Sequence, residues 1–130
     1  MEKNLKFNDL QYELSSYLLR YKNNPIHWYA YGPKPLQLAK DTAKPIFLSI
    51  GHTGSHWCHL MNEESFSSDH SVAKYLNENF INIKVDKEEL PDLDQYMQLA
   101  SQVMNGKGGW PLNVFLTSEF KPFFMGTYFS

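Results

Sequence analysis

The only cysteine of the chain, Cys58, lies in the segment GHTGSHWCHLM with three of the five histidines, His52, His56 and His59. An apolar run, KPIFLSI, precedes this segment, and a helical pattern follows it. A turn between a strand and a helix often carries a reactive group, because the helix N-terminus stabilises a thiolate. Ser55 and Cys58 have the spacing of a C-x-x-C redox pair in which an oxygen replaces the first sulfur.

A dithiol redox cycle requires two sulfur atoms. The first attacks a disulfide as a thiolate, and the second resolves the mixed disulfide that forms. Ser55 stands at the attacking position, and a serine hydroxyl cannot form a disulfide. A self-contained dithiol cycle is therefore excluded, and disulfide reductase activity of this chain is not expected.

Two other roles for Cys58 remain open. An exposed Cys58 could act as a single catalytic thiol, and protonated His56 and His59 would then favour its thiolate. Alternatively, Cys58 is a small buried apolar residue, as free cysteines usually are. In that case Trp57 covers the turn, and the hydroxyl of Ser55 caps the following helix.

A metal site at the same turn is a third hypothesis. His52, His56, Cys58 and His59 are ligand types that suit zinc or copper. Their spacing is poor, because structural sites usually draw their ligands from two separate pairs. These four residues are therefore weak candidates, and we expect no metal and no cofactor.

Two further segments could suggest a site. The acidic run DKEELPDLD, residues 86–94, lacks the glycine and the alternating ligands of an EF-hand loop, so we interpret it as a strand end followed by an acidic helix N-terminus. The glycines of GKGG, residues 106–109, do not match a P-loop and indicate a tight turn before Trp110 and Pro111.

Length and composition narrow the class of protein. The 130 residues suffice for one compact domain, and the hydrophobic fraction of 42% is enough for a core. The net charge is -2, and the sequence has no basic patch typical of nucleic-acid binding. There is no apolar run long enough to span a membrane and no signal-peptide pattern at the start. A single cysteine fits a reducing compartment, so we expect a cytoplasmic protein.

The periodicity of apolar residues predicts an α/β order of elements. Residues 1–33 are rich in aromatics and irregular, and we expect them to form an arm that packs on a domain of residues 34–130. The run at 46–50 indicates a strand buried on both faces, whereas INIKVD alternates. The expected elements are a helix at 35–43, a strand at 46–50, helices at 55–66 and 69–79, a strand at 81–86, a helix at 91–104, and a hairpin of strands at 112–116 and 123–129.

The helix at 91–104 has the clearest pattern. Asp92 and Asp94 fall in its first turn, where the helix dipole favours acids, and Gly106 should end it. An apolar stripe with the i, i+3, i+4, i+7 spacing of a helix is formed by Leu93, Tyr96, Met97, Ala100, Val103 and Met104.

The motifs match a known family in order along almost the whole chain, from about Ser15 onward. The segments are NPIHWYAYG, KPIFLSIGHTGSHWCHLMNEESF, VAKYLNENFINIKVDKEELPDLDQYM and GKGGWPLNVFLTSEFKPFFMGTYF. They closely resemble the N-terminal thioredoxin-like domain of the family that includes YyaL and the spermatogenesis-associated proteins. The resemblance implies a thioredoxin-like fold with a central mixed β-sheet flanked by helices, a cis peptide bond at Pro111, and no final C-terminal helix.

The resemblance also indicates what has changed. Members of this family usually have C-H-W-C-H where this chain has Ser55 to His59, an aspartate at His27 and an arginine at Leu90. Full-length members continue into a large helical domain that resembles sugar epimerases. We therefore expect a single thioredoxin-like domain that is part of a longer protein, with a companion domain or another protein as its partner.

The function expected from these observations is a redox-degenerate binding or scaffold module. Its groove would lie between the Ser55 turn and Pro111, lined by His56, Trp57, His59 and Trp110, and would hold an extended peptide by strand-like pairing. The rival hypothesis is an oxidoreductase-type domain that uses Cys58 alone. An uncovered face of the sheet would favour self-association.

Overall fold

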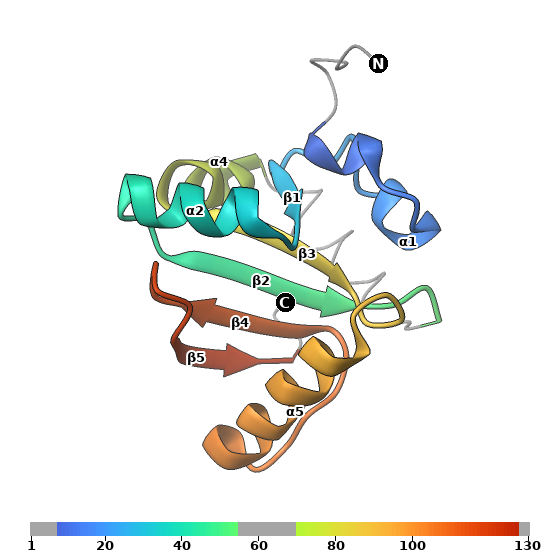
Figure 1. Ribbon diagram of the computed structural model, residues 1–130, viewed down its shortest axis with the longest axis vertical. Helices are drawn as coiled ribbons and strands as arrows, with labels where there is room; N and C mark the ends of the chain where they lie inside the picture. Colours follow the sequence, from blue (N-terminus) through green and yellow to red (C-terminus); the bar gives the residue numbers. More distant parts are fainter. Residues whose placement is uncertain (1–7, 55–69, 128–130) are drawn as a thin grey trace.

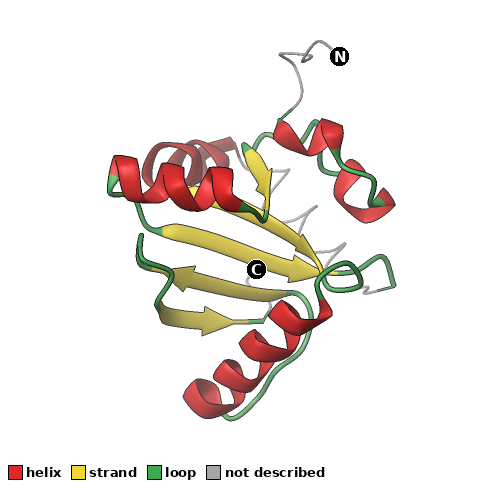
Figure 2. Cartoon of the chain, in the orientation of Figure 1, coloured by secondary structure: helices red, strands yellow, loops and turns green. Residues whose placement is uncertain are grey.

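The structure is a computed structural model that describes residues 8–54 and 70–127. Two short helical elements come first, helices and strands then alternate among the described residues, and two strands come last (Figures 1 and 2). In chain order the elements are η1 (Asp9–Tyr12), α1 (Ser16–Leu19), β1 (Trp28–Ala30), α2 (Pro33–Thr42), β2 (Ile46–Gly51), α4 (His70–Asn79), β3 (Ile81–Asp86), α5 (Pro91–Asn105), β4 (Leu112–Leu116) and β5 (Pro122–Gly126).

The five strands form one mixed sheet in the order β1-β3-β2-β4-β5. β1 and β2 both run parallel to β3, whereas β4 is antiparallel to β2, and β5 is antiparallel to β4. The three parallel strands therefore end at the same edge of the sheet, and β4 begins there. This arrangement confirms the predicted α/β class and the predicted mixed sheet with flanking helices.

Two hydrophobic clusters cover the two faces of the sheet. On one face, Ala39 of α2 and Met97 of α5 pack against Ile46, Leu48 and other residues of the central strands. On the other face, residues of α1 and α4 pack against Phe47 and Trp28. Figure 1 shows α2 and α4 on the same half of the sheet and α5 beside the β4–β5 hairpin.

The helix ends follow local sequence signals. Pro33 and Pro91 occupy the first turns of α2 and α5, where a missing N–H costs nothing. Ala43 ends α2 and Gly106 ends α5, both in the left-handed conformation. The predicted helices at 35–43, 69–79 and 91–104 therefore correspond to α2, α4 and α5, while the helix predicted at 55–66 lies outside the described residues.

The N-terminal arm contributes a strand that sequence periodicity did not reveal. Residues 1–33 were expected to be an irregular arm, but β1 lies within them and pairs with β3 from Trp28 to Ala30. A strand of three residues is too short to show alternation. The arm and the residues from 34 onward therefore share one sheet.

Burial along strand β3 does not follow the alternation of its residues. Apolar and polar residues alternate along this strand, but all six residues are buried. Helices and the arm cover both faces, so the polar side chains of Asn82, Lys84 and Asp86 lie inside the protein. The expected burial of β2 on both faces is confirmed.

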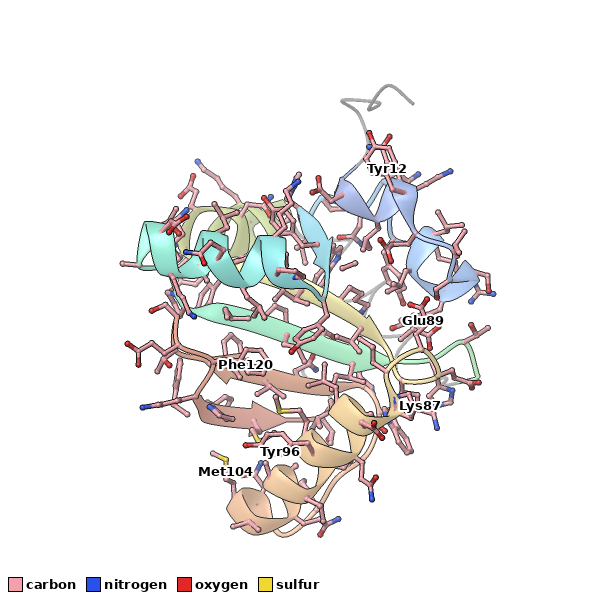
Figure 3. All side chains as sticks on the ribbon, in the orientation of Figure 1. Tyr12, Lys87, Glu89, Tyr96, Met104 and Phe120 are labelled. Atoms are coloured by element: carbon pink, nitrogen blue, oxygen red, sulfur yellow. The ribbon has the colours of Figure 1, made fainter. Side chains whose placement is uncertain are left out.

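Helix α5 buries only part of its apolar stripe. Met97 is fully buried, whereas Tyr96 and Val103 are 60% and 87% exposed. Figure 3 shows Tyr96 and Met104 on this helix, which lies at the border of the sheet. The stripe of six apolar residues therefore lies only partly in the core. Among the described residues, no helix combines the length and apolarity that a membrane span requires.

Candidate functional site

The described residues of the predicted site, His52, Trp110 and Pro111, lie at the edge where β2 ends and β4 begins. β2 ends at Gly51, and residues 52–54 form the turn that follows. The antiparallel register pairs Ile50 of β2 with Leu112 of β4, so Pro111 lies next to this turn. The peptide bond between Trp110 and Pro111 is cis.

The structure describes only some of the predicted site residues. His52, Trp110 and Pro111 come together, as the ring centroids of His52 and Trp110 are 5.5 Å apart with their planes nearly perpendicular. The remaining candidates lie outside the described residues: Ser55, His56, Trp57, Cys58 and His59. The groove that they were expected to line with Pro111 therefore stays a prediction.

Helix α5 holds Trp110 in a fixed orientation. The indole Nε1 of Trp110 donates a hydrogen bond of 2.8 Å to Oδ1 of Asp94. Gln98 lies one turn further along α5, and its Nε2 approaches the same oxygen at 3.3 Å. Asp94 is buried in spite of its charge, so the hydrogen bonds from these two donors compensate the loss of hydration.

A lysine covers the face of the Trp110 ring. The ammonium nitrogen of Lys87 lies 4.4 Å from the centre of this ring, within the range of a cation–π interaction. Lys87 follows β3 directly, and its backbone N–H donates to the carbonyl of Gly51. The end of β3, the end of β2 and the start of β4 thus meet around one tryptophan.

The glycine-rich segment before Trp110 is clamped by the side chain of Gln98. Its Nε2 donates to the carbonyl oxygen of Gly109 at 3.0 Å, and its Oε1 accepts from the N–H of Gly109 at 2.9 Å. A side chain at Gly108 would collide with Oε1 of Gln98. Gly109 has a φ of 142°, which side chains other than glycine rarely allow. The expected tight turn at 106–109 is therefore built around one glutamine.

Three residues of this site were missed by sequence reasoning. Asp94 was interpreted only as an acid that favours a helix N-terminus, and Lys87 and Gln98 carried no prediction. A polar pair spaced four residues apart on a helix, followed by a glycine-rich segment, is the signal that could have indicated Asp94 and Gln98.

Behind this site, β3 carries a lysine inside the protein. Lys84 is 2% exposed, and its ammonium nitrogen lies 3.3 Å from the hydroxyl of Ser49. The same nitrogen faces the rings of Tyr21 at 4.4 Å, Trp28 at 5.0 Å and Tyr17 at 5.6 Å. Aromatic rings on the arm therefore stabilise a cation on the central sheet.

The metal hypothesis gains no support from the part of the chain that is described. Within residues 8–54 and 70–127, the histidine, aspartate and glutamate side chains form no group of three that could hold an ion. His52 is the one member of the proposed ligand set that falls in these ranges.

Relatives of known sequence share most of this chain. It is 51% identical over 122 residues to an uncharacterized protein of Caenorhabditis elegans and 45% identical to spermatogenesis-associated protein 20 of Homo sapiens. Each alignment covers 94% of this chain but only 17% and 15% of the relative. The chain therefore spans about a sixth of the length of the curated relatives that it matches.

Solved structures of thioredoxin-like proteins share the fold. A DsbH oxidoreductase superimposes with a TM-score of 0.61 at 21% identity, covering 79% of this chain and 73% of the other. A thioredoxin from Thermus thermophilus gives 0.55 at 24% identity, covering 70% and 64%. At these levels of identity the superpositions show a common thioredoxin fold and do not show a common activity.

The sequence of the chain also matches the model of a protein family. The match extends over residues 7–130, and the family is Thioredox_DsbH, described as a protein of unknown function, DUF255. The order of the strands, the position of Trp110 and Pro111 beside the end of β2, and the relatives at 45–51% identity agree with this assignment. The chain therefore belongs to the Thioredox_DsbH family of thioredoxin-like domains.

Proposed function

We propose that this thioredoxin-like domain is a protein-binding module without a dithiol redox cycle of its own. The observation that carries the proposal is the presence of a single cysteine, Cys58, with Ser55 three residues before it. A disulfide cannot form within a chain that has one sulfhydryl group. The fold is retained while the pair of sulfurs that performs its redox chemistry is incomplete.

The surface around Trp110 supports a binding role. An aromatic ring that is held by a hydrogen bond to Asp94 and faced by Lys87 loses little freedom when a ligand contacts it. Tryptophan is also enriched among the residues that contribute most to protein interfaces. We propose that an extended peptide or a companion domain binds across Trp110 and Pro111.

Thiol chemistry tests the redox half of the proposal. We expect Cys58 to react slowly with a chromogenic disulfide across pH in the native protein, and Ser55→Cys to acquire insulin reductase activity. The double variant Ser55→Cys/Cys58→Ser is the matched control, because it moves a single thiol to the first position. Rapid reaction of Cys58, with an apparent pKa well below about 8.5, would instead favour a single-thiol oxidoreductase.

Binding to a peptide that cannot form disulfides tests the other half. We expect alkylated insulin B chain, added at millimolar concentration, to shift the NMR resonances of the Trp110 indole N–H and the Gly109 amide. The indole of Trp28, which is fully buried, serves as the internal control. Unchanged Trp110 and Gly109 resonances would contradict a peptide-binding surface at this position.

A further inference from the structure

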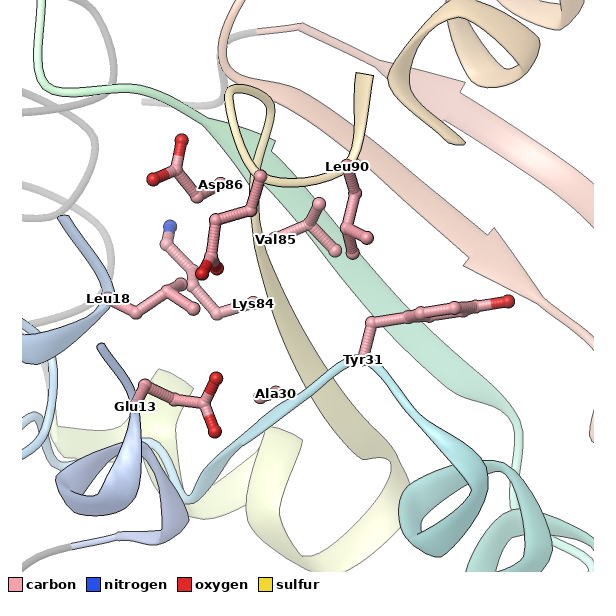
Figure 4. Close-up of a pocket in the computed structure, with 9 residues that line it drawn as sticks. Glu13, Leu18, Ala30, Tyr31, Lys84, Val85, Asp86 and Leu90 are labelled. Atoms are coloured by element: carbon pink, nitrogen blue, oxygen red, sulfur yellow. The ribbon is translucent and has the colours of Figure 1, made fainter. Parts of the chain in front are cut away.

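A cavity of about 230 Å³ lies between the N-terminal arm and the carboxyl ends of the parallel strands. Ala30 ends β1 in its wall, and Lys84 to Asp86 end β3 there. In Figure 4, Glu13 and Asp86 lie on opposite sides of the cavity with Lys84 between them. The crevice beyond the carboxyl ends of parallel strands is where open α/β sheets commonly bind ligands.

A second cavity of about 280 Å³ continues from the first along the arm. The two share Glu13, Ala30 and Tyr31, so together they form one groove, which we call the arm groove. Its outer part is lined by aromatic and proline side chains, which are Tyr12, Tyr29, Tyr31, Pro33 and Pro35. Rings of this kind suit an extended peptide, because they offer large contact area with little loss of side-chain freedom.

Two carboxylates that line the first cavity, the deep part of the arm groove, have no hydrogen bond or ion pair within the described parts of the chain. These are Glu13, which is half-buried, and Glu89, which is exposed. The third acid, Asp86, accepts hydrogen bonds from Ser15 Oγ at 2.7 Å and from the N–H of Glu88 at 2.9 Å. Burial, Asp86 and Glu13 together raise the pKa of Glu89 above its ordinary value. The two glutamates therefore repel each other, and a cation between them would relieve that repulsion.

The positive charge already in the groove does not neutralise these glutamates completely. Lys84 is the one lysine or arginine among the residues that line the deep cavity, and three carboxylates line it too. In the outer cavity Lys34 is paired with Asp9 at 2.7 Å, so its charge is already balanced. The ammonium group of Lys84 faces the rings of Tyr17, Tyr21 and Trp28. The lining of the deep cavity thus retains an excess of negative charge.

We propose that the arm groove binds an extended peptide segment through an arginine side chain, whose guanidinium group lies between Glu13 and Glu89. A guanidinium is planar and donates in a fork, so it can serve two carboxylates at once. The peptide backbone then follows the tyrosine and proline wall. This site is separate from the Trp110 surface, and it does not depend on whether Cys58 is reactive.

Titration with a blocked tripeptide tests the proposal. Acetyl-Gly-Arg-Gly-amide is added to the whole chain at up to millimolar concentration while amide resonances are followed by NMR. We expect saturable shifts at Tyr31 and Glu89, and none from the matched peptide in which citrulline replaces arginine. Citrulline keeps the shape of the side chain and removes its charge.

Variants locate the binding to the two glutamates. Glu13→Gln/Glu89→Gln should weaken binding of the arginine peptide at least about tenfold, because each charged hydrogen bond is lost. Glu88→Gln is the matched control on the same turn, since Glu88 is absent from the lining of either cavity. Retained amide spectra show that each variant is folded.

Three results would overturn the inference. These are the absence of shifts at millimolar arginine peptide, equal binding of the citrulline peptide, and unchanged affinity in the double variant. Binding should also strengthen as the pH rises through the raised pKa of Glu89, since a protonated carboxyl does not attract a guanidinium.

Discussion

At the residue scale, Trp110 makes contacts of three kinds that differ in strength. The hydrogen bond to a buried carboxylate is worth about 1.5–3 kcal/mol, whereas a partly exposed cation–π contact is worth about 0.5–1 kcal/mol. The bond to Asp94 therefore dominates over the contacts with Lys87 and His52. Asp94 is a positioning residue for the surface that Trp110 presents.

Replacement of Asp94 by alanine tests this ranking. We expect Asp94→Ala to lower the free energy of unfolding by about 1–3 kcal/mol, because the indole N–H of Trp110 loses its partner. Asp92→Ala is the control, since Asp92 shares the first turn of α5 but is exposed, and it should cost at most about 1 kcal/mol through the helix dipole. Urea unfolding of both variants measures the difference. Equal losses would mean that the dipole accounts for the whole effect.

At the element scale, α5 serves two purposes with one sequence. Its buried side places Met97 in the core and Asp94 and Gln98 against the segment before Trp110. Its other side leaves Val103 in solvent. The helix therefore contributes to stability through few of its apolar residues, even though its pattern shows a longer stripe.

Two substitutions on α5 compare the contributions of its buried and exposed sides to stability. Met97→Ala should cost about 2–5 kcal/mol of unfolding free energy, because it removes a fully buried side chain and leaves a cavity. Val103→Gln should change the unfolding free energy by less than about 0.5 kcal/mol, as expected for an exposed position. Both are read from chemical denaturation. A large loss for Val103→Gln would show that this side of α5 is covered in solution.

The end of α5 depends on the conformation of one glycine. Gly106 has a φ of 74° and no atom near the place of an added Cβ, so Gly106→Ala should cost about 1 kcal/mol from backbone strain alone. Gly32 also has open space, but its φ of 166° is extended backbone that any residue adopts. Gly32→Ala should therefore be close to neutral. Thermal unfolding of the pair tests this, and equal effects would contradict the role of the left-handed conformation.

At the scale of the whole molecule, the arm is attached to the sheet by polar as well as apolar contacts. Ser15 caps α1 by accepting from the N–H of Leu18, and its hydroxyl donates to Asp86 at the end of β3. The rings of Tyr17 and Tyr21 face the ammonium group of Lys84. Docking of the arm also places Glu13 in the lining of the same cavity as Glu89, whose pKa its charge helps to raise. The hydrogen bond of Ser15 and the ring contacts of Lys84 therefore stabilise the docked arm, whereas the repulsion between Glu13 and Glu89 destabilises it.

The repulsion between these two glutamates predicts that the stability of the protein depends on pH. The pKa of Glu89 is raised in the folded state by burial first, then by Asp86 and Glu13, so the native state binds the proton of Glu89 more tightly than the unfolded state does. The stability that comes from this proton is fully present below the ordinary pKa of about 4.5 and is lost as the pH rises through the raised value.

Thermal unfolding of Glu89→Gln at several pH values checks the sign. The melting temperature of the variant relative to the unchanged protein should rise as the pH increases from about 4 towards neutrality. Glu88→Gln, on the same turn, controls for the loss of one negative charge. A relative melting temperature that falls with increasing pH would contradict the raised pKa.

Part of the candidate site could be predicted because it depends on local order along the chain. The apolar run at 46–50 and the glycine-rich segment before Pro111 each carry a local signal, and family motifs place them opposite each other. The spacing of Asp94 and Gln98 is also a local signal, but it does not reveal which segment their side chains contact. The role of both residues depends on contacts with a segment 11 to 16 residues later in the chain. The helical pattern alone does not show whether their polar side faces solvent or that segment.

Sequence alone was enough to predict the order of most helices and strands, the presence of Ser55 three residues before the single cysteine, and membership of a thioredoxin-like family. These depend on residue type, spacing and periodicity, which are properties of neighbouring residues. Three features could be seen only in the folded chain: β1 joins the sheet, Lys84 lies buried among rings of the arm, and Glu13 and Glu89 line one cavity. Each of these depends on segments about 50 or more residues apart in the chain, and a local pattern carries no information about such distant partners.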